Sequence, residues 1–144
     1  MKYKLLNYRP LNTDIASLFL RIFFGGLFVR YGYNKFMDYD KMLSMFTDII
    51  GIGTKLSLDL LIFAEGVCGL LVLIGFFTRL SVIPIFIAMA VAYFVAHEND
   101  PFDMKTLPLV FLLLSIVIFV LGSGKYSVDG LLFNKKHNKN YVEI

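Results

Sequence analysis

The sequence has one cysteine, two histidines and no tryptophan. Because Cys68 has no second cysteine to pair with, an internal disulfide and a CxxC dithiol are both excluded. We also find no Walker phosphate loop, no GxGxxG, no HExxH zinc motif and no nucleophile elbow. The sequence has no iron–sulfur, haem or flavin signature, so we expect no intrinsic cofactor and no electron transfer by this chain alone. Nothing in it indicates nucleic-acid binding.

Apolar residues, in contrast, are abundant: 58% of the 144 residues are hydrophobic and 16% are aromatic. Soluble domains have about 45–50% apolar residues, and one of this length cannot bury so much apolar surface, whereas lipid solvates it. Four apolar stretches each approach the roughly 20 residues that cross a bilayer as a helix. They run over about 14–36, 56–77, 80–97 and 106–121. We therefore expect an all-α protein, a transmembrane four-helix bundle formed as one domain by residues 1–144.

Lysine and arginine are distributed unevenly over the connecting segments. With four spans, both termini lie on one side, where eight of these residues fall, and the other side has four. The richer side is expected to be cytoplasmic, so we predict cytoplasmic N- and C-termini and a basic cytoplasmic tail over residues 122–144. The Lys135-Lys136 pair of this tail is expected near anionic headgroups. The short Thr78-Arg79 segment is predicted to join the second and third spans.

The first outer loop, residues 37–54, contains a periodic pattern of its own. Its apolar residues from Met42 to Ile50 follow the spacing i, i+3, i+4, i+7. This spacing predicts a short amphipathic helix that lies at the outer membrane interface. Gly51-Ile52-Gly53 is expected to end this helix.

Among the residues that interrupt the apolar stretches, Arg21 and Glu65 are the candidates for a polar site inside the membrane. Arg21 shares a helix face with Gly25, Gly32 and Lys35. The glycines let a neighbouring backbone approach closely, so we expect Arg21 to point into the bundle. A carboxylate such as Glu65 in mid-membrane is unfavourable unless it is paired or protonated. We therefore predict an Arg21–Glu65 pair. Whether this pair forms a functional site or only fixes the register of the helices stays open.

His97 ends the third apolar stretch on the outer side and is followed by Glu98 and Asp100. One histidine with nearby carboxylates is a weak metal signal, and His137 lies on the opposite side of the predicted membrane, so we expect no metal site and no haem held by two histidines. Two interpretations of His97 stay open. It is either a proton-exchanging group at the mouth of a cavity or a solvated helix end.

Several groups of residues also occur in a recognisable order. They are Leu20-Arg21…Gly25…Phe28…Gly32…Lys35-Phe36, then Ala64-Glu65…Gly69-Leu70-Leu71…Gly75-Phe76-Phe77-Thr78-Arg79, then His97, and finally Leu121-Gly122-Ser123-Gly124-Lys125-Tyr126-Ser127-Val128-Asp129. Over about 110 residues, these segments resemble the DoxX/DoxD-like family of small four-helix membrane proteins. The last segment is similar to the GxGRYSLD ending of that family.

The resemblance implies a multi-pass protein of the bacterial cytoplasmic (inner) membrane. Family members often have a glutamate at the start of the fourth helix, where this sequence has Thr106. If that glutamate forms a site with His97, either the site is altered here or Asp103 substitutes for the glutamate. The candidates for an intramembrane polar site are Arg21, Glu65 and His97. The candidates for residues that support this site are Gly32, Lys35, Arg79 and Asp103.

The family includes the small subunit of a thiosulfate:quinone oxidoreductase and partners in oxidative-stress assemblies. The resemblance therefore implies an accessory subunit of a membrane redox system, quinone-linked or related to oxidative stress. A quinone is the expected ligand, and a soluble or membrane oxidoreductase is the expected partner beside the lipid bilayer. Two alternatives stay open, namely a non-enzymatic binder or transporter of small lipophilic molecules and a structural membrane scaffold. The sequence indicates neither the oligomeric state nor whether the chain is catalytic.

Overall fold

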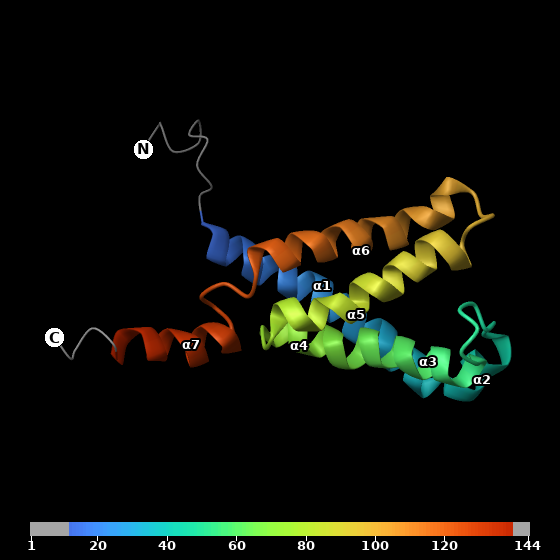
Figure 1. The fold of residues 1–144 in the computed structure, drawn as a ribbon, viewed down its shortest axis with the longest axis horizontal. Helices are drawn as coiled ribbons and strands as arrows, with labels where there is room; N and C mark the ends of the chain where they lie inside the picture. Colours follow the sequence, from blue (N-terminus) through green and yellow to red (C-terminus); the bar gives the residue numbers. More distant parts are fainter. Residues whose placement is uncertain (1–11, 140–144) are drawn as a thin grey trace.

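The computed structural model describes residues 12–139, with side chains described as far as residue 133. The position expected for the Lys135-Lys136 side chains therefore lies outside the described residues. All the regular structure of the described part is helical (Figure 1). Two short segments of it have π-helical geometry. The elements are α1 (Thr13–Met37), α2 (Tyr39–Met45), α3 (Thr54–Ile62), the π-helix η1 (Phe63–Cys68), α4 (Gly69–Ile74), α5 (Thr78–Val91), the π-helix η2 (Ala92–Ala96), α6 (Phe102–Leu121) and α7 (Val128–Lys139).

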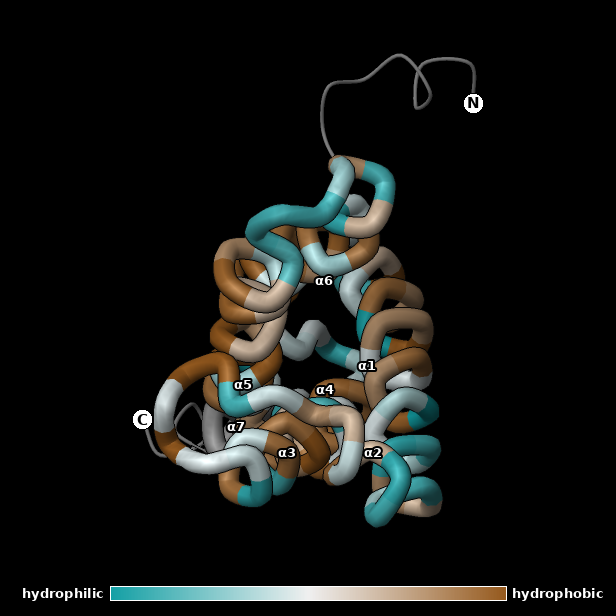
Figure 2. The backbone as a smooth tube through the Cα atoms, turned by 90° about the vertical axis from the view of Figure 1, so that its right-hand side faces the viewer, coloured by the Kyte–Doolittle hydropathy of each residue, from teal (hydrophilic) through white to brown (hydrophobic). Residues whose placement is uncertain are grey.

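Four continuous helical spans are long and apolar enough to cross a membrane. Only between 22% and 39% of each span's apolar window is buried inside the bundle, and hydrophobic residues recur around the whole ring of spans (Figure 2). Lipid is the solvent that accepts such a surface, so the predicted all-α transmembrane fold is confirmed. The spans are Thr13–Met37, Thr54–Ile74, Thr78–Ala96 and Phe102–Leu121.

The spans run alternately up and down, so α1 begins at the end of the bundle where α7 lies, and α2 lies at the opposite end (Figure 1). We call these the α7 end and the α2 end. The first span packs against the second, the second against α5, and α5 against α6, which returns to the first. This order places the two ends of the described chain on the same side of the membrane.

Glycines set how closely the first two spans approach each other. A Cβ added at Gly25 would lie 2.7 Å from the backbone nitrogen of Leu73, and one at Gly69 would lie 2.9 Å from the Cβ of Phe28. A Cβ at Gly32 would collide with the backbone of Gly66. The two backbones are therefore in direct contact over two turns of helix, which fixes their register.

An aromatic cluster fills the interior between α1 and α6. The ring of Phe28 lies 4.7 Å from that of Phe24 and 4.9 Å from that of Phe111, centroid to centroid, in tilted and edge-to-face arrangements. All three side chains are at most 6% exposed. Such ring pairs stabilise the packing beyond the apolar area that they bury, and they separate the two ends of the bundle.

The connection between the second and third spans differs from the prediction. The second span ends at Ile74, three residues earlier than expected, because Gly75 adopts the left-handed conformation (φ 74°) that ends a helix. Helix α5 already begins at Thr78. The turn is therefore Gly75-Phe76-Phe77, and Thr78-Arg79 forms the first turn of α5.

The interfacial helix of the first outer loop is present, but it is shifted from the predicted Met42–Ile50 to Tyr39–Met45. Downstream, the Asp48 carboxylate accepts hydrogen bonds from the backbone nitrogens of Ile52 (3.1 Å) and Gly53 (3.0 Å). This local side-chain bonding competes with the helix for the backbone. Residues 46–53 therefore form a folded loop, and the helix ends well before Gly51-Ile52-Gly53.

Helix α2 is tethered to the second span by a side-chain hydrogen bond. The Tyr39 hydroxyl donates to the Asp59 carboxylate over 2.7 Å. This bond, together with the negative charge of its acceptor, raises the pKa of Tyr39 above its ordinary value. The tether holds the start of the outer loop against the bundle.

Helix α7 was not expected from the sequence, which predicted only a basic tail. The Ser127 hydroxyl accepts a hydrogen bond from the Gly130 backbone nitrogen over 2.9 Å, which is the bond of a helix N-cap. The GxGRYSLD-like segment thus does two things, since it ends α6 and begins α7.

Candidate functional site

The principal candidate site is a cavity of about 570 Å³ between the second and third spans at the α2 end, which we call the α2-end cavity. Its volume lies within the roughly 300–1,000 Å³ of small-molecule sites. Most of its wall is aliphatic or aromatic, and four of its residues are polar or charged. The lining residues are Lys35, Phe46, Ile49, Ile50, Ser57, Leu60, Leu61, Phe63, Ala64, Glu65, Pro84, Ile87, Ala88, Met89, Val91, Ala92, Ala96 and His97.

Glu65 is paired in this cavity, but its partner is Lys35 and not Arg21. The ammonium Nζ of Lys35 donates to Oε2 of Glu65 over 2.5 Å, and the two side chains are 22% and 5% exposed. The ammonium also lies 5.6 Å from the centre of the Tyr31 ring, close enough for a cation–π contact. A buried carboxylate with a charged hydrogen-bond partner is the arrangement that mid-membrane charge requires.

Both π-helical segments contribute to the wall of the α2-end cavity. Phe63, Ala64 and Glu65 come from η1, while Ala92 and Ala96 come from η2. A π-helical turn widens the helix and shifts the side chains around it, and such turns often occur at functional sites. Each of the two spans that enclose the cavity has a π-helical segment at the place where it lines the cavity.

His97 lies at the rim of the α2-end cavity, directly after η2. Its Nδ1 is 2.6 Å from Oδ2 of Asp100, and the two side chains are 37% and 41% exposed. Asp100 is therefore the carboxylate that orients the imidazole, whereas the sequence offered Asp103 only as a substitute for the family's glutamate. The Asp103 side chain is exposed and does not line the cavity.

The folded loop of residues 46–53 covers the α2-end cavity from outside. Phe46, Ile49 and Ile50 line the cavity, so the apolar residues that predicted an interfacial helix face a hollow in the protein. Asp48 stabilises the local fold of this loop through its two backbone hydrogen bonds.

Arg21 is buried at the α7 end, far from Glu65. Its Nη2 donates to the carbonyl of Tyr126 over 2.6 Å, its Nη1 donates to the carbonyl of Leu73 over 3.3 Å, and only 1% of the residue is exposed. The predicted Arg21–Glu65 pair is therefore wrong. The position of α1 that faces Glu65 is Gly32, eleven residues after Arg21 in sequence, or roughly 16 Å along the helix.

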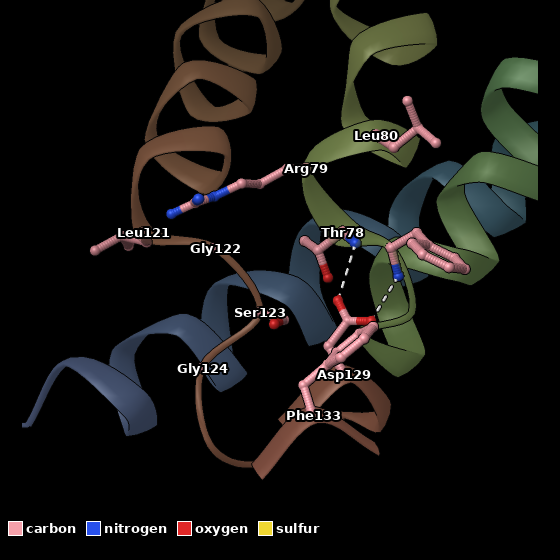
Figure 3. A pocket seen from close by; sticks show the side chains of 10 residues that line it. Thr78, Arg79, Leu80, Leu121, Gly122, Ser123, Gly124, Asp129 and Phe133 are labelled. Carbon is pink, nitrogen blue, oxygen red and sulfur yellow. Dashed lines mark hydrogen bonds between the residues drawn. The ribbon is translucent and has the colours of Figure 1, made fainter. Parts of the chain in front are cut away.

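The GxGRYSLD-like segment joins three spans at the α7 end. Tyr126 receives the Arg21 hydrogen bond, and Ser17 of α1 donates to the Gly122 carbonyl over 2.8 Å. Asp129 accepts from the backbone nitrogens of Phe77 and Thr78, at 2.9 and 3.3 Å (Figure 3). Besides ending α6 and beginning α7, the segment is thus held by specific hydrogen bonds to elements distant in sequence.

A protein-family model provides the comparison that decides the family: the DoxX model matches residues 16–98, which is more than half of the chain. The chain belongs to the DoxX family. The DoxX match covers nearly all of the first three membrane-crossing helices and includes Lys35, Glu65 and His97. No curated protein and no solved structure matches the chain.

The structure separates the candidate residues of this DoxX protein into two groups. Lys35, Glu65 and His97 line the α2-end cavity, and Gly32 packs behind Glu65. The sequence analysis missed the small residues of the third span that make room for the cavity, which are Ala88, Ala92 and Ala96. Their spacing of four residues was a usable signal, because it places them on one helix face.

The second group lies at the α7 end, where Arg21 is buried in the bundle. Arg79 lines a separate cavity of about 460 Å³ there. Neither arginine contributes to the α2-end cavity. Arg21 and Arg79 thus support the structure or a second site, and the polar groups of the principal site come from Lys35, Glu65 and His97.

Proposed function

We propose that this DoxX protein is a membrane-embedded accessory subunit of a redox system and that its α2-end cavity binds a quinone-type molecule. The observation that carries the proposal is the apolar cavity with the Lys35–Glu65 pair in its wall and His97 at its rim. An apolar hollow with a few convergent polar groups is the general form of a small-molecule site.

The cavity suits a ligand that arrives from the lipid. Leu60, Phe63 and Ile87 line it, and they are about half exposed, at 49%, 49% and 55%. Because they lie within the membrane spans, their exposed faces meet acyl chains. A lipophilic molecule can therefore pass sideways from the bilayer, while the loop of residues 46–53 covers the aqueous side.

The polar groups suit a ligand with carbonyl or hydroxyl oxygens. The Lys35 ammonium has three donors, of which one is used by Glu65, so the others can donate to a ligand oxygen. His97, oriented by Asp100, is exposed enough to exchange protons with the aqueous phase. When bound, a quinone supplies two-electron, two-proton redox chemistry. The residues of this chain hold it, and His97 relays protons.

Electrons must then come from a partner, because the sequence has no electron-carrier signature. We infer a soluble or membrane oxidoreductase that delivers them. The distribution of lysine and arginine supports an orientation with the α7 end in the cytoplasm. In a bacterial cytoplasmic membrane, this orientation places the α2-end cavity in the outer half of the bilayer.

The test is to measure quinone binding by the full chain in lipid nanodiscs. Ala92→Phe puts a phenyl ring into the cavity, and Val95→Phe introduces the same ring on the same π-helical segment, where Val95 is 44% exposed and does not line the cavity. We expect a short-chain ubiquinone to bind the parent protein and Val95→Phe alike, and Ala92→Phe at least roughly tenfold more weakly. Equal affinities for both variants, with both folded, would contradict the proposal.

A second candidate, binding or transport of a small lipophile without redox chemistry, is favoured by the same sideways opening. Mass spectrometry of molecules retained after gentle extraction distinguishes the two. Retained quinone supports the redox subunit, and retained lipophiles without quinone support the alternative. If nothing binds and Glu65→Gln only lowers stability, the charges serve helix packing and the chain is a scaffold.

A further inference from the structure

The second cavity, at the α7 end, has the features of a binding site that the proposed function does not use. It lies between the start of α5 and the end of α6, beside the Gly122-Ser123-Gly124 segment, and α7 borders it on another side (Figure 3). Its polar residues are Thr78, Arg79, Ser123 and Asp129. We call it the α7-end cavity, and we infer that it binds the phosphate of an anionic phospholipid headgroup.

Arg79 provides the positive charge. Its guanidinium reaches from α5 across the end of α6 (Figure 3), where Nη2 makes one long hydrogen bond, 3.4 Å, to the Val120 carbonyl. A guanidinium has five N–H donors in a plane that matches phosphate oxygens. Within the described side chains, no carboxylate forms an ion pair with Arg79. Most of its donors are thus available to a ligand.

The hydroxyl of Thr78 is the independent observation that points to a ligand. Thr78 is only 1% exposed, and its Oγ1 has no hydrogen-bond partner among the described residues. Buried hydroxyls are nearly always satisfied, because an unpaired one is unfavourable. The hydroxyl points toward the side of the cavity where Ser123 and Asp129 lie (Figure 3). A phosphate oxygen in the cavity would supply the missing partner.

The carboxylate of Asp129 also lines the cavity, and its charge is already engaged. Its two oxygens accept from the backbone nitrogens of Phe77 and Thr78 at the N-terminus of α5, where the helix dipole stabilises negative charge. Buried Arg21 is a further positive charge that acts on it. Among the described side chains, Asp129 forms no ion pair with Arg79, so the Arg79 guanidinium keeps donors for an anionic ligand.

The rim of the α7-end cavity indicates a lipid rather than a soluble phosphate. Phe77, Leu80 and Leu121 line it and are 49%, 66% and 38% exposed. They stand at the ends of two membrane spans, the depth at which glycerol and the first acyl carbons lie. A basic pocket between spans with an apolar, lipid-facing rim is the form in which headgroups of anionic lipids are bound.

Native mass spectrometry of the full chain, titrated in detergent with phosphatidylglycerol or phosphatidylcholine, tests this inference. We expect Arg79→Gln to weaken phosphatidylglycerol binding about fivefold or more, and Arg79→Lys to retain most of it. Thr78→Val keeps the side-chain shape without the hydroxyl and should weaken the same binding about threefold. Arg30→Gln is the matched control, because it removes an exposed arginine of α1 that lines neither cavity.

Equal affinity of the Arg79→Gln and Arg30→Gln variants for phosphatidylglycerol would overturn the inference. So would equal binding of phosphatidylcholine and phosphatidylglycerol by the parent chain. Displacement of the lipid by millimolar inorganic phosphate would assign the cavity to a soluble anion instead. Circular dichroism and a thermal melt of each variant show whether a loss of binding reflects misfolding. If Arg79→Gln does not fold, the phosphatidylglycerol affinity of Thr78→Val tests the inference instead.

Discussion

Glu65 and Arg21 lie in one membrane bundle, yet each is stabilised by a different set of partners. Glu65 has the Lys35 ammonium, whereas Arg21 has two backbone carbonyls near the end of its span. The difference follows from depth, because Arg21 lies where unpaired carbonyls of a helix end are within reach. Glu65 is an acceptor and needs donors, and the backbone N–H groups of a helix interior are already used within the helix, so Glu65 takes the Lys35 ammonium as its donor.

A double-mutant cycle measures which residue is coupled to Glu65. We expect Lys35→Gln and Glu65→Gln to have a coupling energy of about 1–3 kcal/mol, because each single variant leaves a partly buried charge unpaired. Arg21→Gln and Glu65→Gln should be additive within about 0.5 kcal/mol, since they share no partner. Unfolding free energies in mixed micelles provide the values, and strong Arg21–Glu65 coupling would contradict the structure.

Adjacent glycines of α1 offer a matched pair of substitutions. Gly25→Ala places a Cβ 2.7 Å from the Leu73 backbone nitrogen, whereas at Gly26 nothing lies within 4 Å. We expect Gly25→Ala to destabilise the bundle by about 1–3 kcal/mol, because a backbone must move. Gly26→Ala should be neutral or stabilising by up to about 1 kcal/mol, as alanine is the better helix former. The same unfolding assay compares the two, and an equal effect of both would contradict the close helix contact.

The elements interact across the chain through their ends. Helix α5 begins without a side-chain cap of its own, and Asp129 of α7 provides one from fifty-one residues away. The two π-helical turns similarly lie in different spans but line one cavity. The cap of α5 and the wall of the α2-end cavity each need residues from two elements, so neither can be found in one helix alone.

Asp129→Ala tests whether α7 holds the start of α5. The substitution removes two hydrogen bonds to backbone nitrogens, and we expect a loss of about 1–2 kcal/mol, as for other helix caps. Hydrogen exchange at the Phe77 and Thr78 amides should accelerate. Asp103→Ala is the control, because that exposed carboxylate has no hydrogen bond within the described structure, and its effect should stay within about 0.5 kcal/mol. Unchanged exchange in Asp129→Ala would show that α5 begins independently of α7.

At the scale of the whole molecule, the α2-end and α7-end cavities of the described part lie at opposite ends of the bundle, with the aromatic cluster around Phe28 between them. The spans alternate in direction, so the start of α1 and helix α7 share one face of the membrane (Figure 1). The distribution of basic residues predicts that this face is cytoplasmic. The proposed quinone site and the proposed lipid site then belong to different leaflets.

Labelling with a membrane-impermeant maleimide checks this orientation. Ser44→Cys lies in α2 and Lys125→Cys lies before α7, both at exposed positions, while the native Cys68 is only 3% exposed. We expect Ser44→Cys to react in intact cells and Lys125→Cys to react only after permeabilisation. The parent protein is the unlabelled control. Labelling of Lys125→Cys in intact cells would invert the orientation and move the α2-end cavity to the cytoplasmic half.

Local features of the sequence were sufficient to predict the spans and the family, and they singled out Glu65 and His97, which line the α2-end cavity. Apolar runs predict membrane helices because the bilayer imposes a length of about 20 residues on each of them. A charge inside such a run indicates a constrained position, whatever its partner is. The end of a helix is less well defined by composition, so the turn at Gly75 was misplaced by three residues.

The sequence by itself therefore determined that the chain forms four membrane helices with charged residues turned inward. Only the tertiary structure decided that Glu65 pairs with Lys35, that Asp100 orients His97, and that the outer loop covers the α2-end cavity. The physical reason is register. How far one antiparallel helix slides along another depends on the contacts of Gly25 and Gly32 with the second span, and a shift of a few residues exchanges one partner for another.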